Sequence, residues 1–196
     1  MNGRSKILQL VTLFALTTAS VIAADRFDNH RNWAIYRGDK KANQYSTLQQ
    51  IHAGNVQQLE VAWEHRHGDP NGPSMYSNPI IVDGHLYFTT PKVNVVALDA
   101  ATGKEVWVFE SAKHRPGGKT FRGRNRGVVF WEDEDKANQR IFNFVKDQVF
   151  AIDPKTGKLI QSFGENGAID LRSICPSTLT MPHWKSRHRE SSTKTF

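Results

Sequence analysis

One segment of the chain occurs twice, and the two copies are 54 positions apart. Residues 95–109 (VVALDAATGKEVWVF) align without a gap with residues 149–163 (VFAIDPKTGKLIQSF). The match extends upstream and pairs Tyr87-Phe88 with Ile141-Phe142. Periods of this length are typical of stacked structural units, such as propeller blades or solenoid turns. The repeat therefore favours an architecture in which similar units pack side by side.

Each copy has the pattern of a β-hairpin. A run of β-branched and aromatic residues leads into Asp-x-x-Thr-Gly-Lys, and a second apolar run follows. The Asp and Thr side chains can bond the backbone of the turn, and the glycine can take a positive φ. Further predicted strand pairs precede each hairpin, at residues 79–82 and 86–88, and at residues 127–131 and 140–144.

Four strands per unit, apolar on both faces, predict propeller blades covered on both sides. The predicted fold class is therefore all-β, a partial β-propeller of about two four-stranded blades. Residues 59–63 resemble the last strand of one further blade and are predicted to be an orphan strand. Helix is expected only near the N-terminus and in short pieces near residues 54–58.

The N-terminus has the pattern of an export signal. Arg4 and Lys6 precede an apolar stretch at residues 7–19, and small residues follow before Asp25. This arrangement is typical of a removable signal peptide, predicted over residues 1–24 as a helix. The alternative is a membrane anchor, but the apolar run is shorter than the ~20 residues that a span needs. The expected location is the periplasm or the outside of the cell.

The net charge of +7 is concentrated near the two ends of the chain. Residues 25–172 carry 20 basic and 18 acidic side chains, whereas residues 173–196 carry four basic side chains and one acidic. A domain that binds nucleic acid would concentrate the excess in its body, so no nucleic-acid partner is expected. Nine of residues 173–196 are Ser or Thr and no strand period survives there. These residues are predicted to be a disordered tail that arises from out-of-frame translation or from a truncated gene. The alternative is a basic tail that binds a partner.

The motif Asp99-x-x-Thr102-Gly103-x-x-x-Trp107 resembles the tryptophan-docking repeat of the quinoprotein dehydrogenases that use pyrroloquinoline quinone (PQQ). Further motifs of this family follow in the same order: Trp33-x-x-Tyr36-x-Gly38-Asp39, Gln44-Tyr45-Ser46, Asn55-Val56-x-x-Leu59-x-x-Ala62-Trp63, Asn78-Pro79-Ile80-Ile81-Val82-Asp83-Gly84, Arg126-Gly127-Val128 and Phe163-Gly164-x-x-Gly167-x-x-Asp170-Leu171-Arg172. The resemblance spans roughly residues 28–172 and is strongest to the glucose or sugar branch. The chain is identified as an N-terminal fragment of such an enzyme.

The resemblance implies an eight-bladed propeller with PQQ near its axis and a calcium ion that bridges cofactor and protein. It also implies an aspartate base, a sugar or alcohol substrate that gives a hydride to PQQ, and ubiquinone or a cytochrome as electron acceptor. In this family tryptophans dock between blades, so Trp107 is expected to stabilise the fold. Gln161 replaces that tryptophan in the second copy, and the corresponding interface is expected to be weaker.

One residue is assigned to the cofactor by the resemblance. Arg126 matches the family arginine that pairs with a carboxylate of PQQ, and an arginine fork suits that role. It belongs to a group of six cations in fourteen residues: Lys113, Arg115, Lys119, Arg122, Arg124 and Arg126. The alternative is a solvated loop. The cysteine pair common in the family is absent at Thr120-Phe121, and Tyr76 stands where methanol-type members have an acidic contact.

Two other groups of residues contain side chains that can bind metals. His65 and His67 lack a third ligand at suitable spacing, and a loop after a strand is the commoner interpretation. Residues 132–135 (EDED) resemble a solvated hairpin loop more than a calcium loop, which intersperses glycine and carbonyl ligands. Neither a catalytic nor a metal-binding residue is therefore assigned.

The chain is shorter than the enzyme that it resembles. Eight units at the spacing of the repeat would need about 430 residues, and the family's calcium ligands and aspartate base lie beyond Arg172. The chain is therefore expected to be a truncated dehydrogenase, inactive alone. Two alternatives are a non-enzymatic propeller that binds proteins, and one half of a split enzyme whose complementing chain supplies the other blades.

Overall fold

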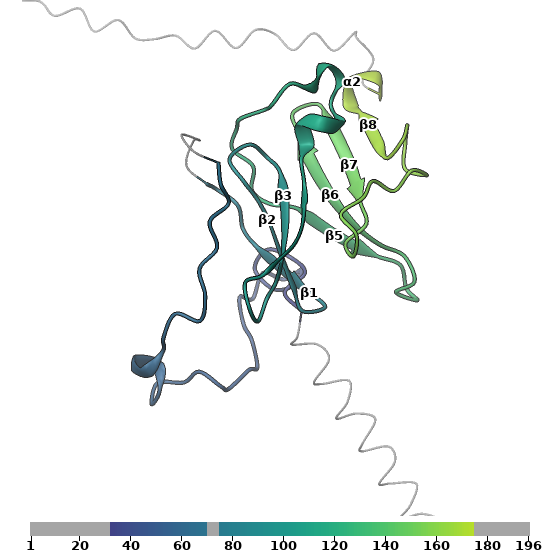
Figure 1. The fold of residues 1–196 in the computed structure, drawn as a ribbon. Coiled ribbons are helices and arrows are strands. Elements are labelled where there is room, and N and C mark those ends of the chain that lie inside the picture. Colours follow the sequence, from purple (N-terminus) through teal and green to yellow (C-terminus); the bar gives the residue numbers. More distant parts are fainter. Residues whose placement is uncertain (1–31, 70–74, 175–196) are drawn as a thin grey trace, which may run out of the picture.

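The computed structural model describes residues 32–69 and 75–174 (Figure 1). The predicted signal peptide lies outside these residues. Of the predicted tail, only Ser173 and Ile174 are described, at the end of the short helix α2 (Leu171–Ile174). Among the described residues, no helix has the length and apolar character needed to cross a bilayer.

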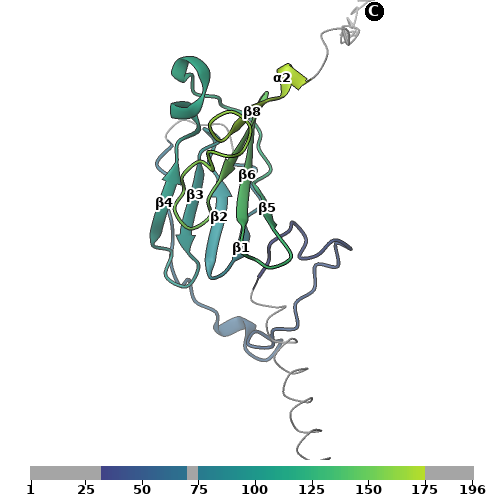
Figure 2. The ribbon, with the colours of Figure 1, turned by 90° about the vertical axis from the view of Figure 1, so that its right-hand side faces the viewer.

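The described residues form two four-stranded antiparallel sheets, which confirms the all-β prediction (Figure 2). In each sheet the strands are neighbours in the order of the sequence, as in a propeller blade. The first sheet consists of β1 (Ile80–Val82), β2 (His85–Thr89), β3 (Val95–Asp99) and β4 (Glu105–Phe109). The second consists of β5 (Val129–Glu132), β6 (Gln139–Val145), β7 (Gln148–Ile152) and β8 (Ala168–Asp170).

The last strand of the second sheet lies later in the chain than the repeat predicts. The repeat predicts a strand in the apolar run after the second Asp-x-x-Thr-Gly-Lys turn, at residues 159–163, but there Leu159 makes only an isolated bridge with Ile152. The chain then loops outward and returns as β8, which pairs with the first half of β7. The loop closes on its own backbone, since Glu165 and Ala168 exchange hydrogen bonds of 2.8 and 3.1 Å. These local bonds replace the sheet bonds that a continuous strand would have made.

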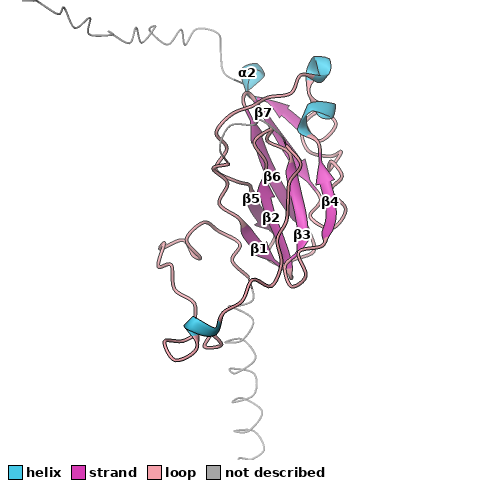
Figure 3. Cartoon of the chain, turned by 60° about the vertical axis from the view of Figure 1, so that its left-hand side comes forward, coloured by secondary structure: helices cyan, strands magenta, loops and turns pink. Residues whose placement is uncertain are grey.

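The predicted orphan strand at residues 59–63 is wrong. These residues form no strand, and Leu59 and Val61 are 55% and 77% exposed. The reason is physical, because a strand needs a neighbouring backbone and the described residues provide none beside this segment. The expected short helix is present as the 3-10 helix η1 (Val56–Gln58), at the end of a loop that extends away from the sheets (Figure 3).

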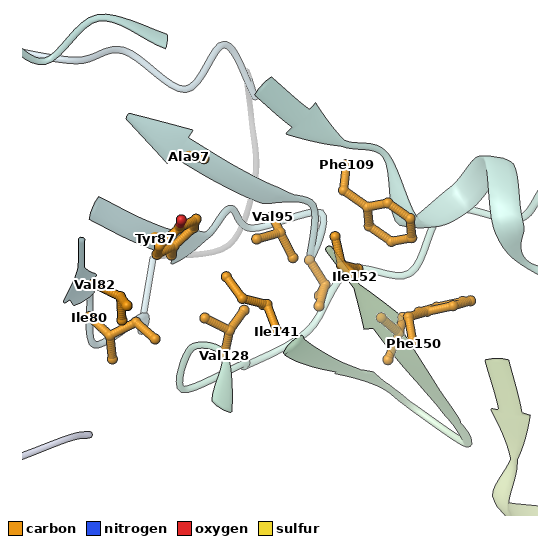
Figure 4. Packing of buried hydrophobic residues seen from close by; sticks show 12 residues of the cluster. Ile80, Val82, Tyr87, Val95, Ala97, Phe109, Val128, Ile141, Phe150 and Ile152 are labelled. Carbon is orange, nitrogen blue, oxygen red and sulfur yellow. The ribbon is translucent and has the colours of Figure 1, made fainter. Parts of the chain in front are cut away.

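The core of the molecule lies between the two sheets (Figure 4). Alternate residues of β1, β2 and β3 face alternate residues of β6 and β7, as the strand period of two requires. Phe109 meets Phe150 at a ring-centroid distance of 5.5 Å. The fully buried members of this cluster include Val93, Val95, Ala97, Ile141, Val145, Phe150 and Ile152. Each sheet therefore hides one apolar face against the other, as stacked blades do.

Trp107 docks onto the second sheet, as predicted. Its indole Nε1 donates a hydrogen bond of 2.9 Å to the carbonyl of Pro154, which lies in the second Asp-x-x-Thr-Gly turn. The indole ring covers Gly157, where a Cβ would lie only 2.6 Å from the Trp107 Cδ2 atom. The Asp-x-x-Thr-Gly turn of the second sheet and Trp107 of the first sheet therefore bind each other and join the two sheets.

Trp63 makes the same contact with the first sheet. Its Nε1 donates to the carbonyl of Ala100 at 3.3 Å, and its ring packs directly on Gly103. The ring also packs against the outer cluster of Phe88, Val96 and Leu98. Thus Trp63 occupies the position of a docking tryptophan even though its segment forms no strand. Gln161 is exposed, and the weaker interface expected there stays a prediction.

The Asp99 carboxylate closes the turn that Trp63 covers. Its Oδ1 accepts hydrogen bonds from the Thr102 hydroxyl at 2.7 Å and the Thr102 amide at 2.8 Å. These bonds favour the ionised carboxylate and hold the pKa of Asp99 below its usual value. The lowered pKa means that the carboxylate stabilises the fold above the unfolded-state pKa of about 3.9, and that this contribution is lost as the pH falls through the folded-state pKa.

We expect the Thr102→Val substitution to raise the pKa of Asp99 because it removes the hydroxyl donor. Carboxyl-carbon NMR titration of the unaltered chain and the variant measures this shift directly. The acid limb of the stability–pH curve should become shallower in the variant between pH 4 and the folded-state pKa. An unchanged Asp99 titration would show that the hydroxyl bond does not form in solution.

Candidate cofactor-binding site

Two segments that lead into the first strands of the sheets lie side by side. Residues 75–78 precede β1, and residues 124–127 precede β5. The backbone N–H and the side-chain Nδ2 of Asn78 both donate to the carbonyl of Arg126, at 3.0 and 3.1 Å. Gly127 lies so close to this segment that a Cβ would be 2.7 Å from the Asn78 carbonyl oxygen. The two blades therefore meet where the predicted cofactor arginine is located.

Asn125 binds the contact between these two segments to both sheets. Its Oδ1 accepts from the Gly127 amide at 2.7 Å and from the Thr89 hydroxyl at 3.2 Å. Its Nδ2 donates to the carbonyl of Phe144 at 2.9 Å. A hydroxyl has one proton, so Thr89 donates to Asn125 and accepts from the Ser77 hydroxyl 3.1 Å away. The backbone of Arg126 is thus held by one side chain bonded to β2 on one side and β6 on the other.

The side chain of Arg126 is exposed, and exposure alternates along this segment. Arg122, Arg124 and Arg126 are exposed, whereas the residues between them are partly buried. The three arginines therefore all extend into solvent from this segment. Residues 111–131 contain no Asp or Glu, and within the described part of the chain no carboxylate forms an ion pair with Arg126. This cation is therefore available to a carboxylate from outside.

The structure divides five of the six predicted cations into two groups. The Lys113 ammonium pairs with Glu110 at 3.0 Å, and Arg115 donates to the carbonyl of Lys119 at 2.8 Å. Arg115 also lies over the ring of Phe121, which packs against the inter-sheet core. These contacts are structural. The arginines at positions 122, 124 and 126 form the second group, nearer to residues 75–78.

Tyr76 lies beside the second group. The guanidinium carbon of Arg124 is 5.1 Å from the centre of the Tyr76 ring, within the range of a cation–π contact. Tyr76 is 46% exposed, so the ring also presents an open surface. The structure therefore brings Tyr76 and Arg126 into one region. Sequence reasoning missed the roles of Arg124 and Asn125, although the alternation of small and cationic residues at 122–127 was a usable signal.

The residues considered above as metal sites, His65 with His67 and residues 132–135, make contacts that stabilise the fold. The edge of the His65 ring packs against Phe88 with a centroid distance of 5.8 Å, and His67 Nδ1 accepts from the Asp69 amide. Asp133 binds both the backbone and the side chain of Asn138, which closes the hairpin loop and lowers the pKa of that carboxyl. Over residues 32–69 and 75–174, no three His, Cys, Asp or Glu residues are grouped so that they could hold a metal.

A family profile for the β-propeller domain of glucose, ethanol and alcohol dehydrogenases that use PQQ matches residues 33–191. The chain belongs to this family. The match covers both sheets and the segments that join them, and it continues past Arg172 into the Ser/Thr-rich residues. The PQQ dehydrogenase propeller thus accounts for the repeat and for the stacking of the two sheets.

Two curated PQQ dehydrogenase relatives illustrate the similarity. The chain is 33% identical over 165 residues to the quinoprotein glucose dehydrogenase of Escherichia coli (strain K12). This alignment covers 76% of this chain and 20% of that protein. The chain is 36% identical over 143 residues to the quinohemoprotein alcohol dehydrogenase ADH-IIG of Pseudomonas putida. That alignment covers 71% of this chain and 18% of that protein. The chain therefore spans about a fifth of the length of these relatives.

Solved structures of two quinohemoprotein alcohol dehydrogenases agree with the fold. The quinohemoprotein alcohol dehydrogenase ADHIIG of Pseudomonas putida HK5 aligns with a TM-score of 0.57 and 33% identity, over 79% of this chain and 21% of that chain. The quinohemoprotein alcohol dehydrogenase of Comamonas testosteroni aligns with a TM-score of 0.52 and 28% identity, over 65% of this chain and 18% of that chain.

Proposed function

We propose that the chain provides part of the PQQ-binding site of a quinoprotein dehydrogenase that oxidises a sugar or an alcohol. Ubiquinone or a cytochrome would receive the electrons. The observation that carries the proposal is the position of Arg126, an exposed arginine with no carboxylate partner among the described residues, on a segment that Asn125 and Asn78 bind to both blades. Family membership and the names of the relatives support the reaction class.

The described residues fit PQQ better than they fit calcium. PQQ carries three carboxylates, and a region with several arginines and no acid suits such a ligand. PQQ, when bound, supplies a quinone that accepts a hydride. Arg126 would bind a carboxylate, and Asn125 would hold its backbone in place. Since the described residues offer no group of metal ligands, no role in calcium binding is derived for them.

We expect the purified chain to bind PQQ and the Arg126→Gln variant to bind it about tenfold or more weakly. The reason is that a charge-assisted hydrogen bond between guanidinium and carboxylate contributes more than a neutral one. Equilibrium dialysis with absorbance detection of PQQ measures both dissociation constants. Equal affinity of the two proteins would remove Arg126 from the site, and no binding by either would contradict the proposed function.

We further propose that the 196 residues alone do not turn over substrate. Reconstitution with PQQ and calcium, followed by a dye-linked assay with glucose and with ethanol, is expected to give no activity above the protein-free control. The outer face of the second sheet supports this proposal, because Val129, Trp131 and Phe144 are 52%, 43% and 47% exposed there. Apolar side chains at such exposure are typical of a surface that packs against further polypeptide, such as a complementing chain. Measurable turnover would contradict the proposal.

The location also remains a proposal. The pattern of residues 1–24, with Arg4 and Lys6 before an apolar stretch, supports export to the periplasm or beyond.

A further inference from the structure

The contact between Tyr76 and Arg124 lies next to Arg126 and joins two residues that belong to neither sheet. Both side chains belong to segments outside the strands; Arg124 is exposed and Tyr76 is about half exposed. The segments themselves are already joined by the bonds between Asn78 and Arg126. The contact is therefore not needed to hold the two segments together.

The contact places the guanidinium group of Arg124 over the ring of Tyr76. A guanidinium group that lies over an aromatic ring uses its face for that ring, and its N–H groups point outward in its plane. Those N–H groups are the ones that bind a carboxylate through two parallel hydrogen bonds. Tyr76 thus holds one arginine in a position where its donors are free of any described carboxylate.

Arg124 and Arg126 are arranged as a pair. They are two residues apart and both exposed, and two residues of a fully extended chain span at most about 7 Å. Two long cationic side chains at this separation can reach one small ligand together. Their mutual repulsion, with no acid in residues 111–131, favours a ligand with at least two negative charges.

We propose that Arg124, oriented by Tyr76, forms a second carboxylate contact beside Arg126, and that the pair recognises a planar ligand with several carboxylates. This inference rests on the proposed function and extends it, since PQQ is such a ligand. The open surface of Tyr76 would lie at the edge of the same site. Arg124 is thereby a binding residue and Tyr76 a positioning residue.

The test compares matched arginine variants of the full chain by equilibrium dialysis with PQQ. Arg124→Gln is expected to raise the dissociation constant about tenfold, and Arg124→Lys to restore part of the affinity. The control is Arg140→Gln, because Arg140 lies over Trp131 at 5.2 Å in the same kind of contact on another face of the molecule. The control should bind PQQ as the unaltered chain does. Thermal unfolding followed by circular dichroism should show the same midpoint for both glutamine variants.

The role of Tyr76 is separated by two further variants. Tyr76→Phe keeps the ring under Arg124 and should bind PQQ with unchanged affinity, whereas Tyr76→Leu should weaken binding at least threefold. Citrate, which carries three carboxylates without a planar ring, is the competing probe. Displacement of PQQ by equimolar citrate would show a general anion site and overturn the inference.

The outcomes distinguish this inference from the proposed function. If Arg126→Gln weakens PQQ binding and Arg124→Gln behaves as Arg140→Gln does, the inference is overturned and the proposed function stands. If the unaltered chain does not bind PQQ, both are overturned.

Discussion

Replacement of Trp107 by alanine is expected to lower the free energy of unfolding by about 3 kcal/mol, the lower end of the range for Trp→Ala at a buried site. The indole is partly buried, donates to the Pro154 carbonyl and packs on Gly157 and Tyr87. Its removal would open a cavity between the two sheets, at the contact that holds them together. Urea unfolding followed by tryptophan fluorescence and circular dichroism measures the effect.

Two variants make the result specific to the docking contact. Trp107→Phe keeps a ring but loses the Nε1 donor, and it should cost about 1 kcal/mol less than the alanine variant. Trp131→Ala removes a tryptophan from the exposed outer face, so its effect should stay below about 1 kcal/mol. Equal losses for Trp107→Ala and Trp131→Ala would mean that the inter-sheet contact does not exist in solution.

The Gly127→Ala variant is expected to have the second large effect, a loss of about 3 kcal/mol of unfolding free energy together with loss of PQQ binding. Gly127 has a φ of +117°, which a residue with a Cβ adopts only with strain. The added Cβ would also lie 2.7 Å from the Asn78 carbonyl oxygen, which is backbone and cannot rotate away. The segments before β1 and β5 would have to separate, and Arg126 would lose its position. Urea unfolding and PQQ dialysis measure the two effects.

Gly84→Ala is the matched control. Gly84 has a φ of +76°, but no atom lies within 4 Å of the position that its Cβ would take. This variant carries backbone strain alone and should cost about 1 kcal/mol, with PQQ affinity unchanged. If Gly127→Ala costs no more than Gly84→Ala, the close approach of the two segments is not maintained in solution.

The repeat predicted most of the strands because local patterns determine them. Asp99 and Thr102 form the turn that their spacing indicates, and β-branched residues of β3 alternate between two apolar faces. The strand expected at residues 159–163 was displaced to β8 because the loop there satisfies its backbone through its own bonds, such as those between Glu165 and Ala168. The residue types in this segment do not show whether its backbone groups bond to β7 or to one another within the loop.

The candidate site was predictable only in part. Arg126 could be assigned because its neighbours in the sequence form a recognisable motif. Asn125 was missed because its partners, Thr89 and Phe144, are 36 and 19 positions away. Tyr76 and Arg124 were missed as a pair for the same reason, since 48 positions separate them and only the packing of two sheets brings them together.

The amino-acid sequence by itself determined the all-β class and the two hairpin turns, because each depends on residue types within about a dozen positions, and the family resemblance identified Trp107 as a docking residue. Only the tertiary structure decided which turn each tryptophan covers and which side chains surround Arg126. Those contacts join residues that are distant in the chain, and they form when burial of the apolar faces between the sheets fixes one relative placement of the two blades.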